Sequence, residues 1–289
     1  MKEIKKAVLH GLKKGLTPSD KLEQLVVDFA IRKTAGSRED LDGVFYSKNG
    51  KHVIMAAKSM SGSYTVCEGV REIDADAFWG CAFLESITLP EGLESIGHEA
   101  FGRCISLRSL TIPESVVKLG TNPFIGTRDL NIVSKSPQIK FDGKAVYSDG
   151  GKTLVAYIAD DKEYSVANGV TTIGEKAFYG KKNLQRITLP ESLKVIDDEA
   201  FFDCDKLLGI TIGKNVDKIG ECAFGDNINL RTIEFCGVPS KMKRTMLAGC
   251  DELRSMVIPY GTMQKFRKIA RDFEDRVVEK GKRKSPIYK

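Results

Sequence analysis

Residues 70–92 read VREIDADAFWGCAFLESITLPEG, and residues 93–115 read LESIGHEAFGRCISLRSLTIPES. Both segments keep Ile, Ala-Phe, Cys and Leu at the same positions, 23 residues apart. A fixed spacing of this length is typical of repeat proteins, in which each unit forms one small piece of supersecondary structure. One degenerate copy and four clear copies bring the count to seven units, at 70–92, 93–115, 116–137, 170–192, 193–215, 216–238 and 239–261.

A single unit is too small to enclose its own apolar residues. If the units stack, each buries its inward residues against the units above and below, and the core becomes continuous along the stack. The sequence therefore predicts a solenoid of about seven coils whose core contains Phe78, Phe101, Phe178 and Phe201. The recurring apolar residues of the first unit are Val70, Ile73, Ala77, Phe78, Cys81, Leu84, Ile87 and Leu89.

Three short segments of each unit suggest local structure. Ile87 to Pro90 alternates between apolar and polar residues and ends at proline, which predicts a strand in a parallel ladder. Val70 to Ile73 predicts a second extended piece, and Asp74 to Cys81 a short helical or 3₁₀ turn. Together these segments predict the α/β fold class.

A second duplicated segment precedes each of the two groups of repeats. Residues 42–56 (DGVFYSKNGKHVIMA) and 142–156 (DGKAVYSDGGKTLVA) are alike, and each has a glycine turn between extended runs. Asn49-Gly50 and Gly150-Gly151 suit hairpin turns that require positive φ. We therefore expect two inserted β-hairpins, one before three coils and the other before four.

The two ends of the chain lack the repeat and predict helical caps over the exposed terminal coils. Thr17-Pro18-Ser19-Asp20 resembles a helix start, followed by a helix from Lys21 to about Lys33. At the other end a helix is indicated by Met263, Phe266, Ile269, Ala270 and Phe273. The expected domains are an N-terminal helical cap at 1–40, the solenoid at 41–262, and a C-terminal helix with a basic tail at 263–289.

The repeat resembles the BspA-like leucine-rich repeats of bacterial and some protozoan surface proteins. The family pattern is I-x-x-x-A-F-x-x-C-x-x-L-x-x-I-x-I-P, and the resemblance covers about residues 41–261. Thr127, Lys181 and Asn227 stand where the pattern has Cys. The resemblance implies a solenoid fold and, from the better-known members, adhesins that bind host or bacterial proteins. The second unit fills the pattern with Ile96, Ala100, Phe101, Cys104, Leu107, Leu110, Ile112 and Pro113.

Cysteine and histidine patterns do not predict a metal or redox site. The seven cysteines include no C-x-x-C pair, and Cys81, Cys104, Cys204 and Cys250 share one repeat position. We interpret these four as small buried residues stacked in a ladder. The three histidines, at positions 10, 52 and 98, share no motif. We therefore expect no metal and no cofactor.

No catalytic motif is apparent in the sequence. Gly151-Lys152-Thr153 imitates the end of a phosphate-binding loop, but Val146 stands where that loop needs glycine. We interpret the protein as a non-enzyme without a small-molecule substrate. An enzyme would be indicated by a polar cleft at the second hairpin, holding Tyr147, Lys152 and Tyr157 with strongly shifted pKa values.

Charge is concentrated at the ends. The 289 residues carry +6 in total, with +4 in residues 1–16 and +5 in residues 280–289, so the body is slightly acidic. An acidic body argues against a nucleic-acid surface across the fold, and both basic ends are expected to be solvated rather than to bind nucleic acid or membrane. No secretion signal or membrane span is apparent, which predicts a cytoplasmic chain.

Solvent-facing strand positions are where a repeat protein usually binds, because side chains there vary without disturbing the core. The interpretation is a non-enzymatic scaffold that binds a protein of unknown identity through this face. The alternative, implied by the resemblance, is a bacterial cell-surface adhesin. The candidate partner-binding residues are Glu85, Ser86, Thr88, Arg108, Ser109, Thr111, Gln185, Arg186, Thr188, Thr211, Arg231 and Glu234.

Overall fold

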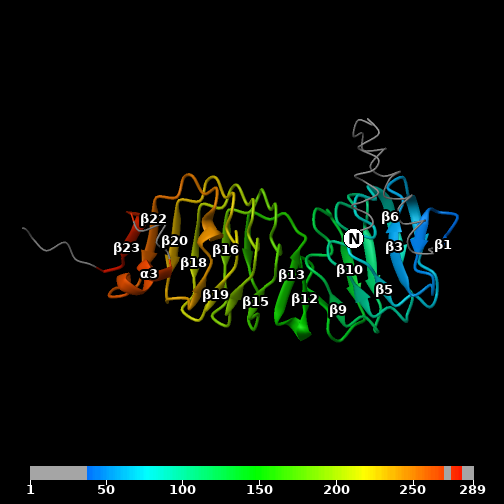
Figure 1. Ribbon diagram of the computed structural model, residues 1–289, viewed down its shortest axis with the longest axis horizontal. Helices are drawn as coiled ribbons and strands as arrows, with labels where there is room; N and C mark the ends of the chain where they lie inside the picture. The colour runs from blue at the N-terminus through cyan, green and yellow to red at the C-terminus, as the bar shows by residue number, and fades with distance from the viewer. Residues whose placement is uncertain (1–37, 270–274, 282–289) are drawn as a thin grey trace, which may run out of the picture.

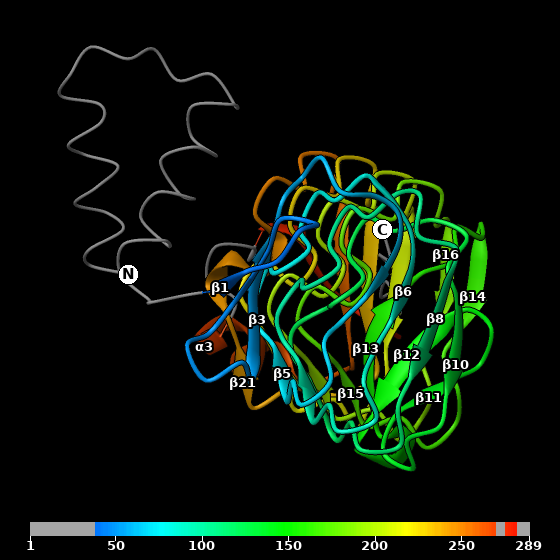
Figure 2. The same ribbon diagram turned by 90° about the vertical axis from the view of Figure 1, so that its right-hand side faces the viewer.

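The computed structural model describes residues 38–269 and 275–281, and over these residues the chain winds into an elongated β-solenoid (Figure 1). It has about ten turns, more than the predicted seven, and it is mostly strand with little helix. Figure 2 looks along the stack and shows two walls of strands on opposite sides of each coil. The α/β prediction is therefore corrected to a β-solenoid.

We call the first wall the hairpin wall, because both hairpins belong to it. It consists of a six-stranded sheet, β1-β2-β3-β5-β7-β9, and a seven-stranded sheet, β11-β12-β13-β15-β17-β19-β21. The strands are β1 (Arg38–Glu39), β2 (Val44–Tyr46), β3 (His52–Ala56), β5 (Glu72–Ile73), β7 (Ser95–Ile96), β9 (Lys118–Leu119), β11 (Lys140–Phe141), β12 (Ala145–Ser148), β13 (Thr153–Tyr157), β15 (Thr172–Ile173), β17 (Val195–Ile196), β19 (Lys218–Ile219) and β21 (Lys241–Met242).

The opposite side, here the long-strand wall, has three sheets: β10-β8-β6-β4, β14-β16 and β18-β20-β22-β23. Its strands pair in parallel and in register, so that Ser86 lies beside Ser109 and Ile87 beside Leu110, 23 residues on. The strands are β4 (Ser61–Thr65), β6 (Phe83–Thr88), β8 (Ser109–Ile112), β10 (Asn131–Ser134), β14 (Glu163–Ser165), β16 (Arg186–Thr188), β18 (Gly209–Ile212), β20 (Thr232–Phe235), β22 (Ser255–Ile258) and β23 (Val277–Glu279).

The segment from Asp74 to Cys81 is a series of turns, not the predicted helical or 3₁₀ turn. Asp76 and Gly80 have φ of 60° and 74°, left-handed values that interrupt a right-handed helix. The amide of Phe78 donates to the carbonyl of Ala100 in the next coil at 2.8 Å. Such bonds between coils alternate with local bonds inside the segment, such as that from the Trp79 amide to the Asp76 carbonyl at 2.9 Å, so no continuous helix forms. The last full coil does contain a 3₁₀ helix, η2 (Arg244–Leu247).

Each hairpin region begins a coil of its own. β2 pairs antiparallel with β3, and β12 pairs antiparallel with β13 across the 3₁₀ helix η1 (Asp149–Gly151). β3 then pairs in parallel with β5, and β13 with β15, so the second strand of each hairpin continues the ladder. The segments expected as insertions therefore belong to the stack, which is one reason why there are more turns than 23-residue units.

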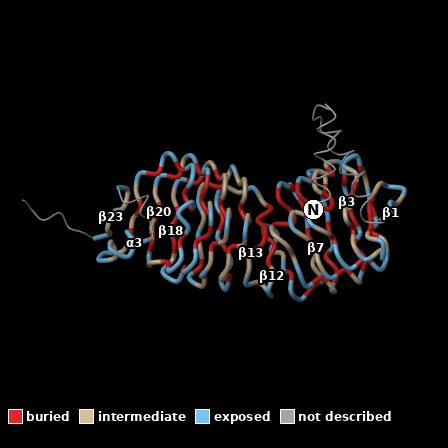
Figure 3. The backbone as a smooth tube through the Cα atoms, in the orientation of Figure 1, coloured by how far each residue is buried: buried red, intermediate tan, exposed pale blue. Residues whose placement is uncertain are grey.

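The core is divided into two clusters, so the prediction of one continuous core is wrong. Phe78 and Phe101 stack at 5.3 Å between ring centroids in the first cluster, and Phe178 and Phe201 at 4.8 Å in the second. All four rings are 0% exposed. Figure 3 shows the buried residues running along both parts of the solenoid. Within each cluster, neighbouring coils bury their apolar residues against one another, as predicted.

Strands β12 and β13 separate the two clusters. Val146 and Ala156 pack in the first cluster, whereas Tyr147 and Leu154 pack in the second. Successive side chains of a strand point to opposite faces, so a hairpin that is buried on both faces closes one core and opens the next. We call the turns on either side of this hairpin the first and second stacks.

At the C-terminal end, helix α3 (Met263–Ile269) lies against the last coil, and β23 pairs with β22. Phe266 of α3 is 0% exposed and meets the ring of Phe235 edge-on at 5.2 Å. Ala270, Phe273 and the N-terminal helix expected at 21–33 lie outside the described residues.

Candidate binding surface

The twelve residues predicted to contact a partner all lie on or beside the long-strand wall, and none of them is buried. Nine belong to the strands themselves, and the other three, Arg108, Gln185 and Arg231, directly precede a strand. Ile87 and Leu110 on the same strands are 5% and 2% exposed and face the core. The alternation of inward and outward residues therefore produces a row of solvent-facing side chains on each stack.

On the first stack this face is uncharged and rich in hydroxyl groups. Thr65 lies beside Thr88 in the strand register, and Thr111 lies beside Val133, which is 54% exposed. The hydroxyl of Ser86 donates to that of Ser63 at 2.8 Å. Glu85 and Arg108 border the row with opposite charges. A row of short, uncharged side chains costs less to desolvate than a row of charged ones.

On the second stack the face carries charges that pair with one another. Arg186 forms an ion pair with Glu163 of the neighbouring strand. Glu234 accepts a hydrogen bond from the Nζ atom of Lys280 at 2.5 Å. Leu208, at the flank position equivalent to Arg231, is 51% exposed. The two stacks therefore offer chemically different surfaces.

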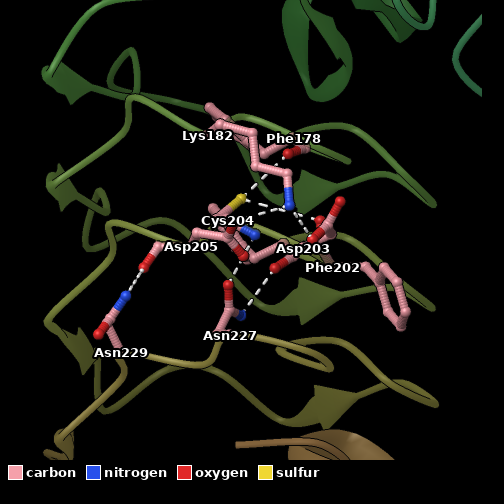
Figure 4. Close-up of polar contacts among 9 residues, drawn as sticks. Phe178, Lys182, Phe202, Asp203, Cys204, Asp205, Asn227 and Asn229 are labelled. Carbon is pink, nitrogen blue, oxygen red and sulfur yellow. Dashed lines mark hydrogen bonds and ion pairs between the residues drawn. The ribbon is translucent and has the colours of Figure 1, made fainter.

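The cysteine ladder is a structural feature. Figure 4 shows Cys204 donating its thiol to the carbonyl of Phe178, at 3.1 Å. Cys104 and Cys250 make the equivalent bonds to Phe78 and Phe224. Burial raises the pKa of the Cys204 thiol to about 12, so the reactive thiolate is scarce at neutral pH.

Asn227 takes the place of a ladder cysteine and satisfies more backbone groups than a thiol can. Its Nδ2 donates to the carbonyls of Phe201 and Phe224 at 2.8 and 2.7 Å. Its Oδ1 accepts from the amide of Cys204 at 2.8 Å (Figure 4). This buried side chain joins two coils. Cys67 and Cys222 are partly exposed, and Cys236 is exposed.

The three residues expected in a polar cleft at the second hairpin, Tyr147, Lys152 and Tyr157, do not line a common pocket. Tyr147 and Lys152 line a pocket of about 420 Å³, but Tyr157 is not among its lining residues. The Tyr147 hydroxyl donates to Asp142 at 2.7 Å and contacts the Tyr164 hydroxyl. Burial raises the pKa of Tyr147, which keeps the phenol protonated. The arrangement holds the hairpin against the coil, and it gives no support to catalysis.

Within the described residues, a single group of three could approach a metal: His52, Glu72 and Asp74, whose ligand atoms lie within 4.8 Å of one another. The His52 ring is already hydrogen-bonded to Asp74 at 3.0 Å. The second stack has Thr153 and Thr172 in the register of His52 and Glu72. The group is therefore a polar surface contact that is not repeated.

A larger cleft lies between the two stacks, and no motif pointed to it. It measures about 810 Å³ and is lined from both sides, by Arg128 of the first stack and by Lys181 of the second. The sequence shows Lys181 as a departure from the cysteine position, but only the structure shows that this departure faces a cavity.

The described part of the chain contains no helix with the length and apolar character needed to cross a bilayer.

Registered parallel strands, stacked coils and an exposed strand face define a repeat-protein solenoid. A family model, the BspA type leucine rich repeat region, matches six copies over residues 63–153 and 157–272. The chain therefore belongs to the BspA-type leucine-rich repeat family. No curated protein matches it in sequence.

Three solved structures are similar, each with a TM-score of 0.56. A leucine rich cell surface protein from Faecalibacterium prausnitzii is 23% identical over 72% of this chain, and the pneumococcal vaccine antigen PcpA is 22% identical over 69%. A leucine-rich repeat protein from Eubacterium ventriosum is 21% identical over 68%. The chain spans only 62%, 57% and 60% of these proteins, and the likeness establishes the fold.

Proposed function

We propose that this chain is a non-enzymatic scaffold that binds another protein through the long-strand wall. The observation that carries the proposal is the row of solvent-facing side chains, built on parallel strands that pair residues 22 or 23 positions apart. Leucine-rich repeats of this family are in general interaction scaffolds. Binding over several coils would spread the contact energy across many modest contacts around a few stronger ones.

The hydroxyl-rich face of the first stack is the preferred contact region, because its groups carry no competing internal ion pairs. The test replaces Thr65, Thr88 and Thr111 by arginine in one variant. The proteins that this variant captures from a cell lysate are compared with those captured by the wild type. A matched control changes Glu72, Ser95 and Lys118 to arginine, one per coil on the hairpin wall, for the same net change of charge.

A partner retained by the wild type and the control, but weakened about tenfold or more by the face variant, supports the proposal. Equal retention by both variants contradicts it. We expect Thr111→Ala alone to weaken binding little, because a single exposed threonine supplies a small part of the area. Loss of all binding in that variant would show that the contact is not shared across coils.

A second candidate function is adhesion at a bacterial cell surface, favoured by the similarity in fold to the leucine rich cell surface protein from F. prausnitzii. Both candidates use the same face, and they differ in where the protein resides. Protease treatment of intact cells separates them, because a surface protein is cut whereas an internal one survives.

A further inference from the structure

On both sides of the cleft between the two stacks, the cysteine ladder is interrupted by another residue. Its volume of about 810 Å³ lies within the range of small-molecule sites, which is roughly 300–1,000 Å³. The ladder position is Thr127 in the last coil of the first stack and Lys181 in the second stack, and both residues line the cleft. Local departures from a repeat pattern are expected where function overrides packing.

Thr127 has a structural explanation, since its hydroxyl donates to the carbonyl of Phe124 at 2.7 Å. Lys181 has no equivalent one. Among the described residues its amine forms no ion pair or hydrogen bond, and its one close contact is a cation–π contact over the Tyr157 ring, 5.5 Å from the ring centre. Burial lowers the pKa of Lys181 to about 8, so holding its charge in the cleft is costly without an anion.

The charges around Lys181 leave the cations of the cleft without full compensation. Asp160 lines the cleft, accepts a hydrogen bond from Asn183 at 2.6 Å, and raises the pKa of Lys181 against the larger effect of burial. Asp129, also in the lining, lies 3.8 Å from Arg108. Lys182 also lines the cleft, but its amine is paired with Asp203 and Asp205 (Figure 4). The guanidinium of Arg128, across the cleft, forms no hydrogen bond or ion pair within the described residues, and its charge further lowers the pKa of Lys181. Two cationic groups on opposite walls therefore remain available.

We propose that this cleft binds a small anionic molecule, with the amine of Lys181 and the guanidinium of Arg128 contacting its phosphate or carboxylate group. An oxyanion between them would complete two charge-assisted hydrogen bonds and would bridge the two stacks. None of the twelve candidate partner-binding residues lines the cleft, so failure of this proposal would not affect the proposed protein-binding role.

The test titrates the full chain with inorganic phosphate and, separately, with citrate, by calorimetry. We expect saturable binding of at least one probe, and the probe that binds distinguishes a phosphate ligand from a carboxylate ligand. Lys181→Cys restores the family residue, so the variant should fold, and Arg128→Gln changes an exposed side chain. Each variant should weaken binding about tenfold or more, whereas Lys214→Met, which removes an exposed lysine that does not line the cleft, should not.

A second measurement locates the site directly. The rate at which a small succinimidyl ester acylates each lysine is followed by peptide mass mapping. The bound probe should slow the labelling of Lys181 and leave Lys214 unchanged, and this protection should disappear in the Arg128→Gln variant. The proposal is overturned if neither probe binds, if Lys181→Cys binds as the wild type does, or if Lys181 is not protected.

Discussion

At the scale of the residue, position within the coil decides what a side chain can tolerate. Ile96 is 1% exposed in β7 and packs in the first core cluster, whereas Thr88 is exposed on β6. Both lie on strands and differ chiefly in which way they point. The consequences of substitution should therefore differ greatly.

We predict that Ile96→Asp lowers the free energy of unfolding by about 3 kcal/mol or more, because it buries an unpaired carboxylate. Thr88→Ser should change it by less than about 1 kcal/mol. Urea unfolding of both variants against the wild type provides the measurement. Equal midpoints would mean that the inward and outward assignments are reversed.

A second residue-scale prediction concerns Asp142. Burial opposes ionisation of its carboxyl group, but hydrogen bonds from Tyr147, Tyr164 and two backbone amides outweigh this and lower its pKa. A lowered folded-state pKa stabilises the protein above the unfolded-state value, near 3.9, and this contribution is lost as the pH falls through the folded-state value.

Asp142→Asn should therefore be less stable than the wild type at pH 7, and the difference should shrink as the pH is lowered below about 4. Urea unfolding at a series of pH values measures the difference between the two proteins. A difference that stays constant from pH 7 to pH 3 would contradict the role assigned to the ionised carboxylate.

Residue spacing predicted much of the fold. The 23-residue period correctly placed Phe78, Phe101, Phe178 and Phe201 inside, and it placed the candidate face outside. The same period could not distinguish Asn227, which bonds three backbone groups, from Lys181, which lines a cleft, because both are simply departures from cysteine. Only the coordinates show which neighbours each one meets.

At the scale of the element, glycines allow adjacent coils to approach closely. A Cβ atom built on Gly97 would lie 2.6 Å from backbone atoms of Asp74 and Ala75 in the preceding coil. Backbone cannot move aside as a flexible side chain can. By contrast, a Cβ atom on Gly213 would meet nothing within 4 Å.

We predict that Gly97→Ala destabilises the protein by about 1–3 kcal/mol, because the two coils must be pushed apart. Gly213→Ala is the matched control, and its effect should stay within about 1 kcal/mol of zero. Thermal unfolding of the two variants checks this expectation. If Gly97→Ala melts no lower than Gly213→Ala, the coils are not packed as closely as described.

Two parts of the fold were not predicted correctly from the sequence, each for a physical reason. The run from Asp74 to Cys81 has helical composition, but the left-handed φ of Asp76 depends on hydrogen bonds to the neighbouring coil, which a single unit does not reveal. The apolar runs at 145–147 and 154–158 are buried on both faces. A continuous apolar run is the signal of such two-sided burial, and it could have predicted the partition between the cores.

At the scale of the whole molecule, the two stacks meet at the β12–β13 hairpin and through a few polar contacts. Lys176 of the second stack pairs with Glu99 of the first at 2.7 Å, and the Asn122 side chain donates to the Lys176 carbonyl at 2.6 Å. The molecule is thus two short solenoids in series. The division at 40 and 262 into caps and solenoid remains a proposal, as does residence in the cytoplasm.

The central claim is that neighbouring coils bury each other's apolar residues, within each stack but not between the stacks. A double-mutant cycle tests it most directly, with Phe78→Leu and Phe101→Leu in adjacent coils, and Phe101→Leu with Phe201→Leu across the stacks. We predict a coupling energy of about 0.5–1.5 kcal/mol for the adjacent pair, whose rings stack, and additivity within about 0.5 kcal/mol for the pair in separate clusters. Additivity in the adjacent pair, or equal coupling in both pairs, would contradict the account.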